Sequence, residues 1–330
     1  MLDKKDSRTK TQKFWALLTL LIVIAVISSG CGGAKYPEKP VTLIVHASEG
    51  GGSDIFARTL AASNETDKFL SQPILVENKP GGSGAVAFEY VGGQKGDPYF
   101  LLTAVTTFLT TPLQGLTSVT HQDFTPIANL AFDEFVVIVK ADSQYQTMKD
   151  LVDDARARPQ AVKVGGTNLG GPDSICAYLI EKASGIKFTY VVFGSGGETN
   201  DGLMGGNIDF AVSNPGEALE LAEAGDIRIL GVFSEKRLAG APNLPTLKEQ
   251  GIDAVYVQNR GLVAPGGIPA ADRKVLEDAL LKYTQTETFK EYIADNMLTE
   301  AWMDGATFGN WMEEENGKYA AILKDMGVIK

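Results

Sequence analysis

The sequence predicts an α/β fold in which helices alternate with the strands of a largely parallel sheet. Short apolar runs of strand length recur along the chain, and segments with helical spacing follow most of them. Glycine-rich turns stand between several of these strands and helices. The chain has 330 residues, of which 44% are hydrophobic, so it is long enough for two domains with ordinary cores.

The N-terminal segment has the pattern of an export signal. Basic residues within Lys4–Lys13 precede an apolar run, Phe14–Ile27, that is shorter than the ~20 residues of a membrane span. Small residues then lead to Cys31, as in a bacterial lipobox. We therefore expect a signal peptide over residues 1–30, lipidation of Cys31 and a linker over 31–36. An ordinary cleaved signal or an uncleaved anchor is the alternative.

Charge and cysteine content exclude several classes of function. A net charge of −11 disfavours nucleic acid as a partner. Besides Cys31, the only cysteine is Cys176, so no disulfide is expected in the mature chain. With only His46 and His121 beside it, the chain shows neither a Cys/His metal pattern nor a Cys–His nucleophile. No metal or cofactor is expected, and Cys176 is expected to be buried.

Strands are expected where short, β-branched runs are bounded by turn residues. In chain order these are Val41–Val45, Ile74–Glu77, Phe100–Thr103, Phe135–Val139, Lys163–Gly165, Phe188–Val192, Ile208–Val212, Ile229–Phe233 and Gly261–Ala264.

Helices are expected where apolar residues recur at three- to four-residue steps. They are Asp54–Ala62, Ser83–Val91, Met148–Ala157, Ser174–Ser184, Glu198–Gly205, Asn214–Ala224, Ala270–Gln285, Thr288–Asn296 and Gly305–Asp325.

The glycine turn Glu49–Asp54 connects the first strand to the first helix. Glycines let the backbone approach a ligand closely, and a helix start presents unpaired N–H groups and a partial positive charge. Such a corner suits a small anion such as a carboxylate. Alternatively, it is a tight turn in which Ser53 or Asp54 caps the helix. His46, at the end of the strand, either faces the same cleft or has a structural role.

Three further glycine turns follow strands. Gly82-x-Gly84-x-x-Ala87 fits a loose dinucleotide fingerprint, which we reject because an exported protein rarely meets NAD. Gly165–Ser174 and Phe193–Glu198 supply Ser, Thr and Asn donors. Together these corners predict a cleft that binds an anion through hydrogen bonds without reacting with it.

At this point the ordered motifs resemble the solute-binding proteins of tripartite tricarboxylate transporters, the TctC or Bug family. The matching segments are Tyr36-Pro37-x-x-Pro40-Val41-x-Leu43-Ile44-Val45, Gly51-Gly52-Ser53-Asp54-x-x-Ala57-Arg58, Val76–Gly84, Asp123–Ile127, Leu203–Asp209, Pro242–Gly251 and Gly261–Pro265.

The resemblance implies a type II periplasmic-binding-protein-like fold with two α/β lobes, a hinge and a ligand cleft between the lobes. One lobe would comprise residues 37–139 and 257–330, and the other 140–256, with hinge crossings near Lys140 and Val257. The family holds a ligand carboxylate on two turns, partly through water. These correspond here to Ser48–Asp54 and Gly165–Asp173.

The expected ligand-binding residues come from the cleft-facing corners. They are Ser48, Gly51, Gly52, Ser53, Asp54, Gly166, Thr167, Asn168, Gly171, Asp173, Ser195, Asn214 and Arg260.

Several of the expected positions have two interpretations. Arg260 either pairs with a second ligand carboxylate or forms a surface or hinge ion pair. Asp173 and Glu198 either accept from a ligand amine or cap their helices. His46–Glu49, Phe193–Ser195 and Arg260 stand where the family usually carries other residues.

The resemblance implies a non-enzymatic receptor in the periplasm or on the outer face of the cell membrane. It would capture a small carboxylate (a tricarboxylate, dicarboxylate or related organic acid) as a monomer and deliver it to the permease subunits. A solute-sensing accessory protein is one alternative. An extracytoplasmic hydrolase is disfavoured because the chain lacks a G-x-S-x-G elbow.

Overall fold

The computed structural model describes residues 36–330, and Lys39–Lys330 form one compact unit. The expected signal peptide and the lipidation site at Cys31 lie outside the described residues. Within the described range, no helix is both long enough and apolar enough to cross a membrane.

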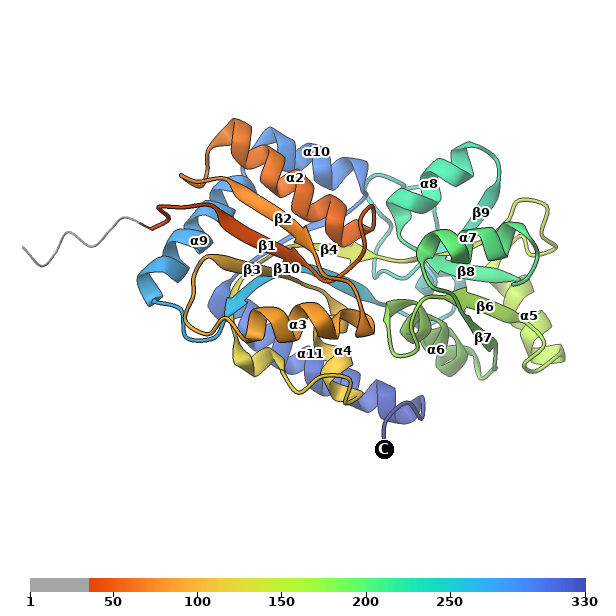
Figure 1. The fold of residues 1–330 in the computed structure, drawn as a ribbon. Helices are drawn as coiled ribbons and strands as arrows, with labels where there is room; N and C mark the ends of the chain where they lie inside the picture. The colour runs from red at the N-terminus through yellow and green to blue at the C-terminus, as the bar shows by residue number, and fades with distance from the viewer. Residues whose placement is uncertain (1–35) are drawn as a thin grey trace, which may run out of the picture. The chain divides into compact units, whose positions relative to one another are not determined.

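Two separate sheets organise this unit (Figure 1). The six-stranded sheet has the order β11-β4-β10-β3-β1-β2, with β1 Val41–Val45, β2 Ile74–Asn78, β3 Phe100–Ala104, β4 Phe124–Glu134, β10 Val257–Pro265 and β11 Thr299–Asp304. The five-stranded sheet has the order β7-β6-β8-β5-β9, with β5 Val136–Lys140, β6 Lys163–Gly166, β7 Thr189–Val192, β8 Phe210–Ser213 and β9 Ile227–Val232.

Both sheets are mixed, so the prediction of a largely parallel sheet was wrong. Strand β1 pairs in parallel with β2 and β3, and β6 pairs in parallel with β7 and β8. Strand β10 runs antiparallel to β3 and β4, β11 to β4, and β5 to β8 and β9. Hydrophobic periodicity identifies a strand but carries no information on its direction, which is set where the chain changes sheet.

Helices cover both faces of each sheet. They are α2 Gly52–Asp67, α3 Ala85–Gly92, α4 Thr106–Leu113, α5 Met148–Ala157, α6 Pro172–Ser184, α7 Gly196–Met204, α8 Pro215–Glu223, α9 Ala270–Tyr283, α10 Glu287–Asp295 and α11 Gly305–Asp325, with short 3₁₀ turns at Gly82–Gly84, His121–Asp123 and Lys248–Gln250. In the larger half, α2 contacts α9 and α10, and α4 contacts α3 and α11 on the opposite face (Figure 1).

Strand β5 shows how the smaller sheet is buried on both faces. Val137 and Val139 belong to a core cluster that contains residues of α5 and α6. Val136 and Ile138 belong to a second cluster with residues of α7 and α8. Because side chains alternate along a strand, one continuous apolar run fills both clusters.

The sequence did not predict α4, β4 or β11. Helix α4 is rich in Thr and contains Pro112, which gives it a weak intrinsic helix propensity. Strand β4 carries polar residues that only the folded protein accommodates; for example, Asn129 is fully buried and donates to the carbonyl of Ala301 in β11 at 2.8 Å. Tertiary packing, rather than local pattern, stabilises these elements.

The chain changes sheet close to Phe135. Strand β4 ends at Glu134 in the larger sheet, and β5 begins at Val136 in the smaller one. This differs from a crossing near Lys140, because Val136–Lys140 pairs with β8 and β9. The chain re-enters the larger sheet in β10, which begins at Val257. The exact division into lobes stays a prediction.

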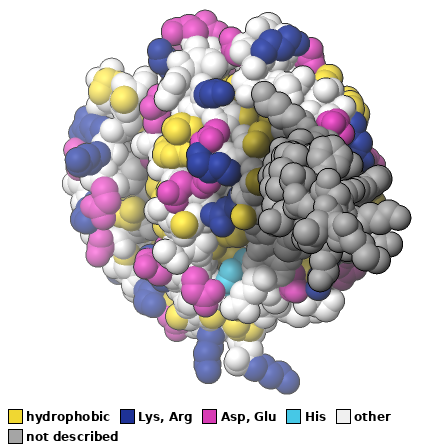
Figure 2. Space-filling model, turned by 90° about the vertical axis from the view of Figure 1, so that its left-hand side faces the viewer, with side chains coloured by type: hydrophobic (Ala, Val, Ile, Leu, Met, Phe, Trp, Pro, Cys, Tyr) yellow, Lys and Arg dark blue, Asp and Glu magenta, His cyan; other side chains and the backbone are white. Residues whose placement is uncertain are grey.

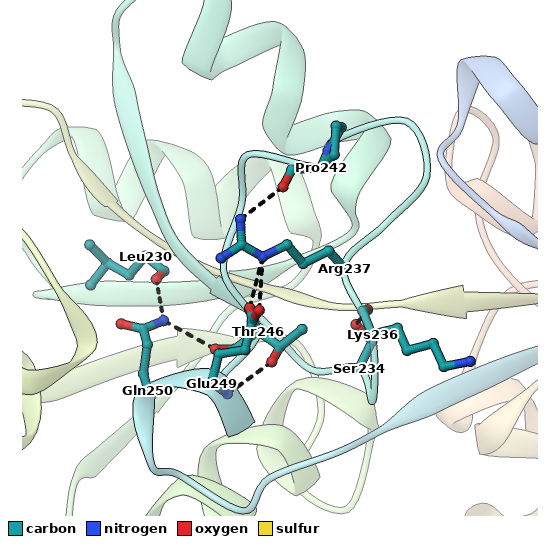
Figure 3. Close-up of polar contacts among 8 residues, drawn as sticks. All are labelled: Leu230, Ser234, Lys236, Arg237, Pro242, Thr246, Glu249 and Gln250. Atoms are coloured by element: carbon teal, nitrogen blue, oxygen red, sulfur yellow. Dashed lines mark hydrogen bonds and ion pairs between the residues drawn. The ribbon is translucent and has the colours of Figure 1, made fainter.

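Side-chain hydrogen bonds stabilise the connection between β9 and β10 (Figure 3). Arg237 Nε donates to both carboxylate oxygens of Glu249 at 3.0 and 2.9 Å. The backbone N–H of Thr246 donates to Glu249, whose own N–H donates to the Thr246 hydroxyl. Gln250 donates to the backbone of β9 at 2.9 Å. The motif Pro242–Gly251 therefore folds this connection against its sheet.

Acidic and basic side chains are interspersed on the face drawn in Figure 2, outside the grey atoms. That face offers no continuous basic surface for a polyanion.

Candidate functional site

A cavity of about 240 Å³ lies where the ends of the two sheets face each other. Residues from both halves line it. They are His46, Ala47, Gly51, Gly52, Ser53, Val105, Thr107, Phe135, Thr167, Asn168, Pro172, Asp173, Gly196, Thr199, Asn200, Val212, Ser213, Asn214, Glu217, Gln258 and Arg260.

Five helices begin at this cavity. Helices α2, α4, α6, α7 and α8 each contribute an N-cap or first-turn residue to the lining. Each follows a strand, so the topology places five helix N-termini at one place (Figure 1). Their first N–H groups have no partner within the helix and carry a partial positive charge. The cavity is therefore suited to a small anion.

The first corner places Gly51, Gly52 and Ser53 against the cavity and against Arg260. A Cβ on Gly52 would lie 2.7 Å from Arg260 Nη2, so a larger residue here would have to displace the guanidinium. Arg260 Nη1 is 3.4 Å from the Ser53 hydroxyl. The guanidinium thus adds a full positive charge beside the positive end of α2.

Arg260 forms a buried ion pair with Asp133, which is 1% exposed. Desolvation lowers the pKa of Arg260, but the Asp133 carboxylate outweighs it, so the pKa is raised overall. Asn214, the N-cap of α8 in the smaller half, donates to the same Asp133 oxygen at 2.8 Å. The ion pair is thus buried rather than superficial, Asn214 links it to the smaller half, and its guanidinium also lines the cavity.

The second corner carries Thr167, Asn168 and Asp173 into the lining. The backbone N–H and the hydroxyl of Thr167 donate to Asp173 Oδ2 at 2.8 and 2.9 Å. Desolvation nevertheless raises the pKa of Asp173 above its ordinary value. Asp173 therefore stabilises the turn at Thr167 and also lines the cavity.

Eight of the expected residues line the cavity and five do not. Ser48, Asp54, Gly166, Gly171 and Ser195 are absent from the lining. Asp54 turns inward and accepts from Gly50 N, Arg58 Nε and Asn78 Nδ2. Ser195 caps α7 by accepting from Glu198 N at 3.2 Å, and Glu198 accepts in return from Gly194 N. Ser195, rather than Glu198, is thus the N-cap of α7, and the N-cap of α2 is Gly51 rather than Ser53 or Asp54.

His46 lines the cavity at the end of β1. Its Nδ1 lies 3.0 Å from the Thr103 hydroxyl. Desolvation and the nearby Arg260 charge lower the pKa of His46 to about 4, so the imidazole is neutral at physiological pH. His46 therefore contributes a neutral hydrogen-bonding side chain to the cavity lining, and not a positive charge.

Sequence reasoning did not place Thr107, Gln258 or Glu217 at the site. Thr107 could have been found from the rule that ligand sites gather at the carboxyl ends of parallel strands, because it follows β3. Glu217 follows β8 in the same way. Gln258 lies in β10, and nothing in the local pattern indicated that this strand reaches the cavity.

The lining of the cavity carries groups that can bind an anion. Its lining contains hydroxyl groups, amides and helix N-termini, and within the described part of the chain no serine or cysteine is hydrogen-bonded to His46. Cys176 is fully buried, and burial raises the pKa of its thiol. Among residues 36–330, no group of three His, Cys, Asp or Glu side chains is placed to hold a metal ion.

Two α/β halves joined by crossing strands, with an anion-suited cavity between them, form the architecture of a solute-binding protein. Residues 56–328 match the family model described as Tripartite tricarboxylate transporter family receptor, TctC. The chain belongs to this family of solute-binding receptors.

Individual relatives agree with this assignment. The chain is 28% identical to the "UPF0065 protein in gbd 5'region" of Cupriavidus necator, over 96% of both chains. It is also similar to the crystal structure of a TctC solute-binding protein from Polaromonas, at 31% identity and a TM-score of 0.71, covering 88% of this chain and 99% of that one.

Two more distant structures share the fold. They are MatC from Rhodopseudomonas palustris with bound malate (20% identity, TM-score 0.76, 87% of this chain and 100% of that one) and a second R. palustris protein with adipate (23%, 0.81, 88% and 98%).

Proposed function

We propose that this protein captures a small carboxylate and delivers it to the membrane permease subunits of a tripartite tricarboxylate-type transporter. The observation that carries the proposal is the meeting of five helix N-termini at one cavity. The partial positive charges and backbone N–H donors of helix N-termini can bind a carboxylate without help from a cationic side chain.

Two proteins of the same fold support a carboxylate ligand. One is described with bound malate and the other with adipate. Both ligands are small organic acids, and the cavity of about 240 Å³ suits a ligand of that size.

Ligand binding would favour a closed arrangement of the two halves. Gly51–Ser53 belong to one half, and Thr167 and Asn168 to the other. A ligand that contacts both corners binds the closed state better than the open one, and so shifts the population toward closure. A permease can then distinguish loaded receptor from empty receptor by shape.

Isothermal titration calorimetry with ligand-free protein and a panel of citrate, malate, adipate, succinate and glutarate, together with monocarboxylates and amino acids, tests the binding step. We expect heat and a raised melting temperature with at least one member. Absence of both across the panel would overturn carboxylate capture. Uptake of the bound compound is then measured in cells that lack the permease genes. Uptake should be lost if the receptor serves transport, because transport requires those subunits. It should persist if the receptor serves only sensing.

We further propose that the receptor acts as a monomer held at the membrane by a lipid on Cys31. Metabolic labelling with a tagged fatty acid should mark the wild-type chain and Cys176→Ser, but not Cys31→Ser. Label retained in Cys31→Ser would exclude the anchor. Light scattering of the mature chain checks the monomeric state.

A further inference from the structure

The charged side chains of the cavity are distributed unequally, and this bears on the second end of the ligand. Of the residues that the structure describes, Arg260 is the one cationic side chain in the lining, and Asp133 already neutralises it. From the smaller half, the lining carries Asp173 and Glu217. One wall therefore favours an anion, whereas the other opposes a second one.

Glu217 is a carboxylate without a partner. It lies in the first turn of α8, and none of the described residues forms a hydrogen bond or ion pair with it. Desolvation raises its pKa first, and the Asp133 charge adds to this, while Arg260 opposes it. Glu217 is exposed, and it lines the cavity.

Glu217 also borders a smaller recess of about 30 Å³ next to the main cavity. Gly52, Asn214 and Arg260 border both spaces, so Glu217 and the first corner face one continuous region. A Cβ on Gly196 would lie 3.8 Å from Glu217 Oε2, which places this carboxylate beside the N-terminus of α7.

Two buried donors on the opposite wall have no partner among the described residues. The Thr107 hydroxyl and Arg260 Nε lack hydrogen bonds, although their residues are only 8% and 5% exposed and both line the cavity. Leaving buried polar groups unpaired is unfavourable. Thr107 in the first turn of α4 and Arg260 beside Gly52 of α2 belong to the wall on which a ligand carboxylate would bind.

We propose that the ligand is a zwitterion, with one carboxylate and one cationic amine. Its carboxylate binds at Gly52, Thr107 and Arg260, and its amine binds to Glu217. This rests on the proposed function and narrows it from small carboxylates in general to amino-acid-like ones. Glu217 is the specificity-determining residue, because it attracts a cation and repels a second carboxylate.

The test compares ligands of equal length that differ in one end group. Calorimetry with ligand-free protein uses β-alanine against succinate and γ-aminobutyrate against glutarate, together with a set of α-amino acids. We expect a zwitterion to bind at least about tenfold more tightly than its matched dicarboxylate. Glu217→Gln should reduce this preference by about tenfold.

Glu220→Gln is the matched control, because Glu220 lies exposed on the same helix but outside the cavity lining. It should leave the preference unchanged. The comparison in the wild-type protein stands even if Glu217→Gln folds poorly, which a melting curve would show. Tighter binding of dicarboxylates overturns the zwitterion while preserving carboxylate capture. No binding by any compound overturns both.

Discussion

The two glycine corners of this protein have the same sequence pattern but use their acidic residues in opposite ways. In the first corner, Asp54 is 2% exposed and accepts from Arg58, Asn78 and Gly50. In the second, Asp173 accepts only from Thr167 among the described side chains and lines the cavity. The Asp54 carboxylate stabilises its own corner, whereas the Asp173 carboxylate lines the cavity.

The pKa values of these two carboxyl groups shift in opposite directions. Desolvation raises the pKa of Asp54, but the hydrogen bond from Arg58 and those from Gly50 and Asn78 outweigh it, so the pKa falls. Asp173 has no cationic partner among the described residues, and desolvation raises its pKa. An acidic residue at a helix start thus acquires its role from the donors that the tertiary structure brings to it.

Replacing Gly52 should have the largest effect on binding. In Gly52→Leu the new side chain would meet Arg260 Nη2, where even a Cβ lies at 2.7 Å, and would fill the first corner. We expect affinity to fall by about 100-fold or more, in line with the cost of overpacking. Calorimetry with the ligand identified from the panel measures this.

Gly317→Leu is the control for that substitution. Gly317 is an exposed helical glycine outside the cavity lining, and a Cβ added to it would have no described atom within 4 Å. This variant should bind normally. Normal affinity in Gly52→Leu would show that the first corner does not contact the ligand.

Removing Asp54 should destabilise the fold, whereas removing the charge of Asp173 should not. Asp54→Asn weakens the pairing with Arg58 and should cost about 2 kcal/mol at pH 7. Because the folded pKa of Asp54 is lowered, its contribution is present above the pKa of the unfolded chain and is lost as pH falls through the folded value. Urea unfolding at several pH values measures both effects.

For Asp173→Asn in the second corner we expect no loss of stability. Its folded pKa is raised, so ionisation costs stability as pH rises through the folded value. We expect unchanged or slightly higher stability at pH 7, with Thr167 still bonded to the amide oxygen. Equal losses in the two variants would show that the corners do not differ.

His46 distinguishes the first corner by a smaller, pH-dependent effect. Its pKa is lowered from 6.5 to about 4, so the unfolded chain takes up a proton in this interval that the folded chain does not. The free energy of unfolding should therefore fall as pH decreases from about 6.5 to about 4. His46→Gln should reduce the number of protons taken up on unfolding in this interval by up to about one. An NMR titration that shows the His46 ring protonating near 6.5 would contradict it.

The strands and helices with strong local patterns were predictable. Strand β1 was expected over Val41–Val45 and α5 over Met148–Ala157, and both have these bounds. In α5 the apolar residues recur on one face, and Thr147 and Asp150 form a reciprocal cap, so local signals are consistent with the packing. Strand β11 lacked such signals, because it is an edge strand whose partner is β4.

The candidate site was predictable mainly at its glycine corners. Gly51, Gly52 and Thr167 follow strands and open helices, which is visible in the sequence. The Asp133–Arg260 pair joins β4 to β10, and the chain between these residues forms the whole smaller sheet. Nothing in the sequence around Asp133 or Arg260 indicates that the two residues form an ion pair.

The sequence alone determined the alternation of strands and helices, the glycine corners and the family resemblance, because these depend on spacing along the chain. Only the tertiary structure decided which corner residues line the cavity, that Asp54 does not, and that Glu217 lines the same cavity as Arg260 with no hydrogen-bond partner among the described residues. The physical reason is that burial, charge pairing and hydrogen bonding are properties of neighbours in space, and the two halves meet only after both sheets have folded.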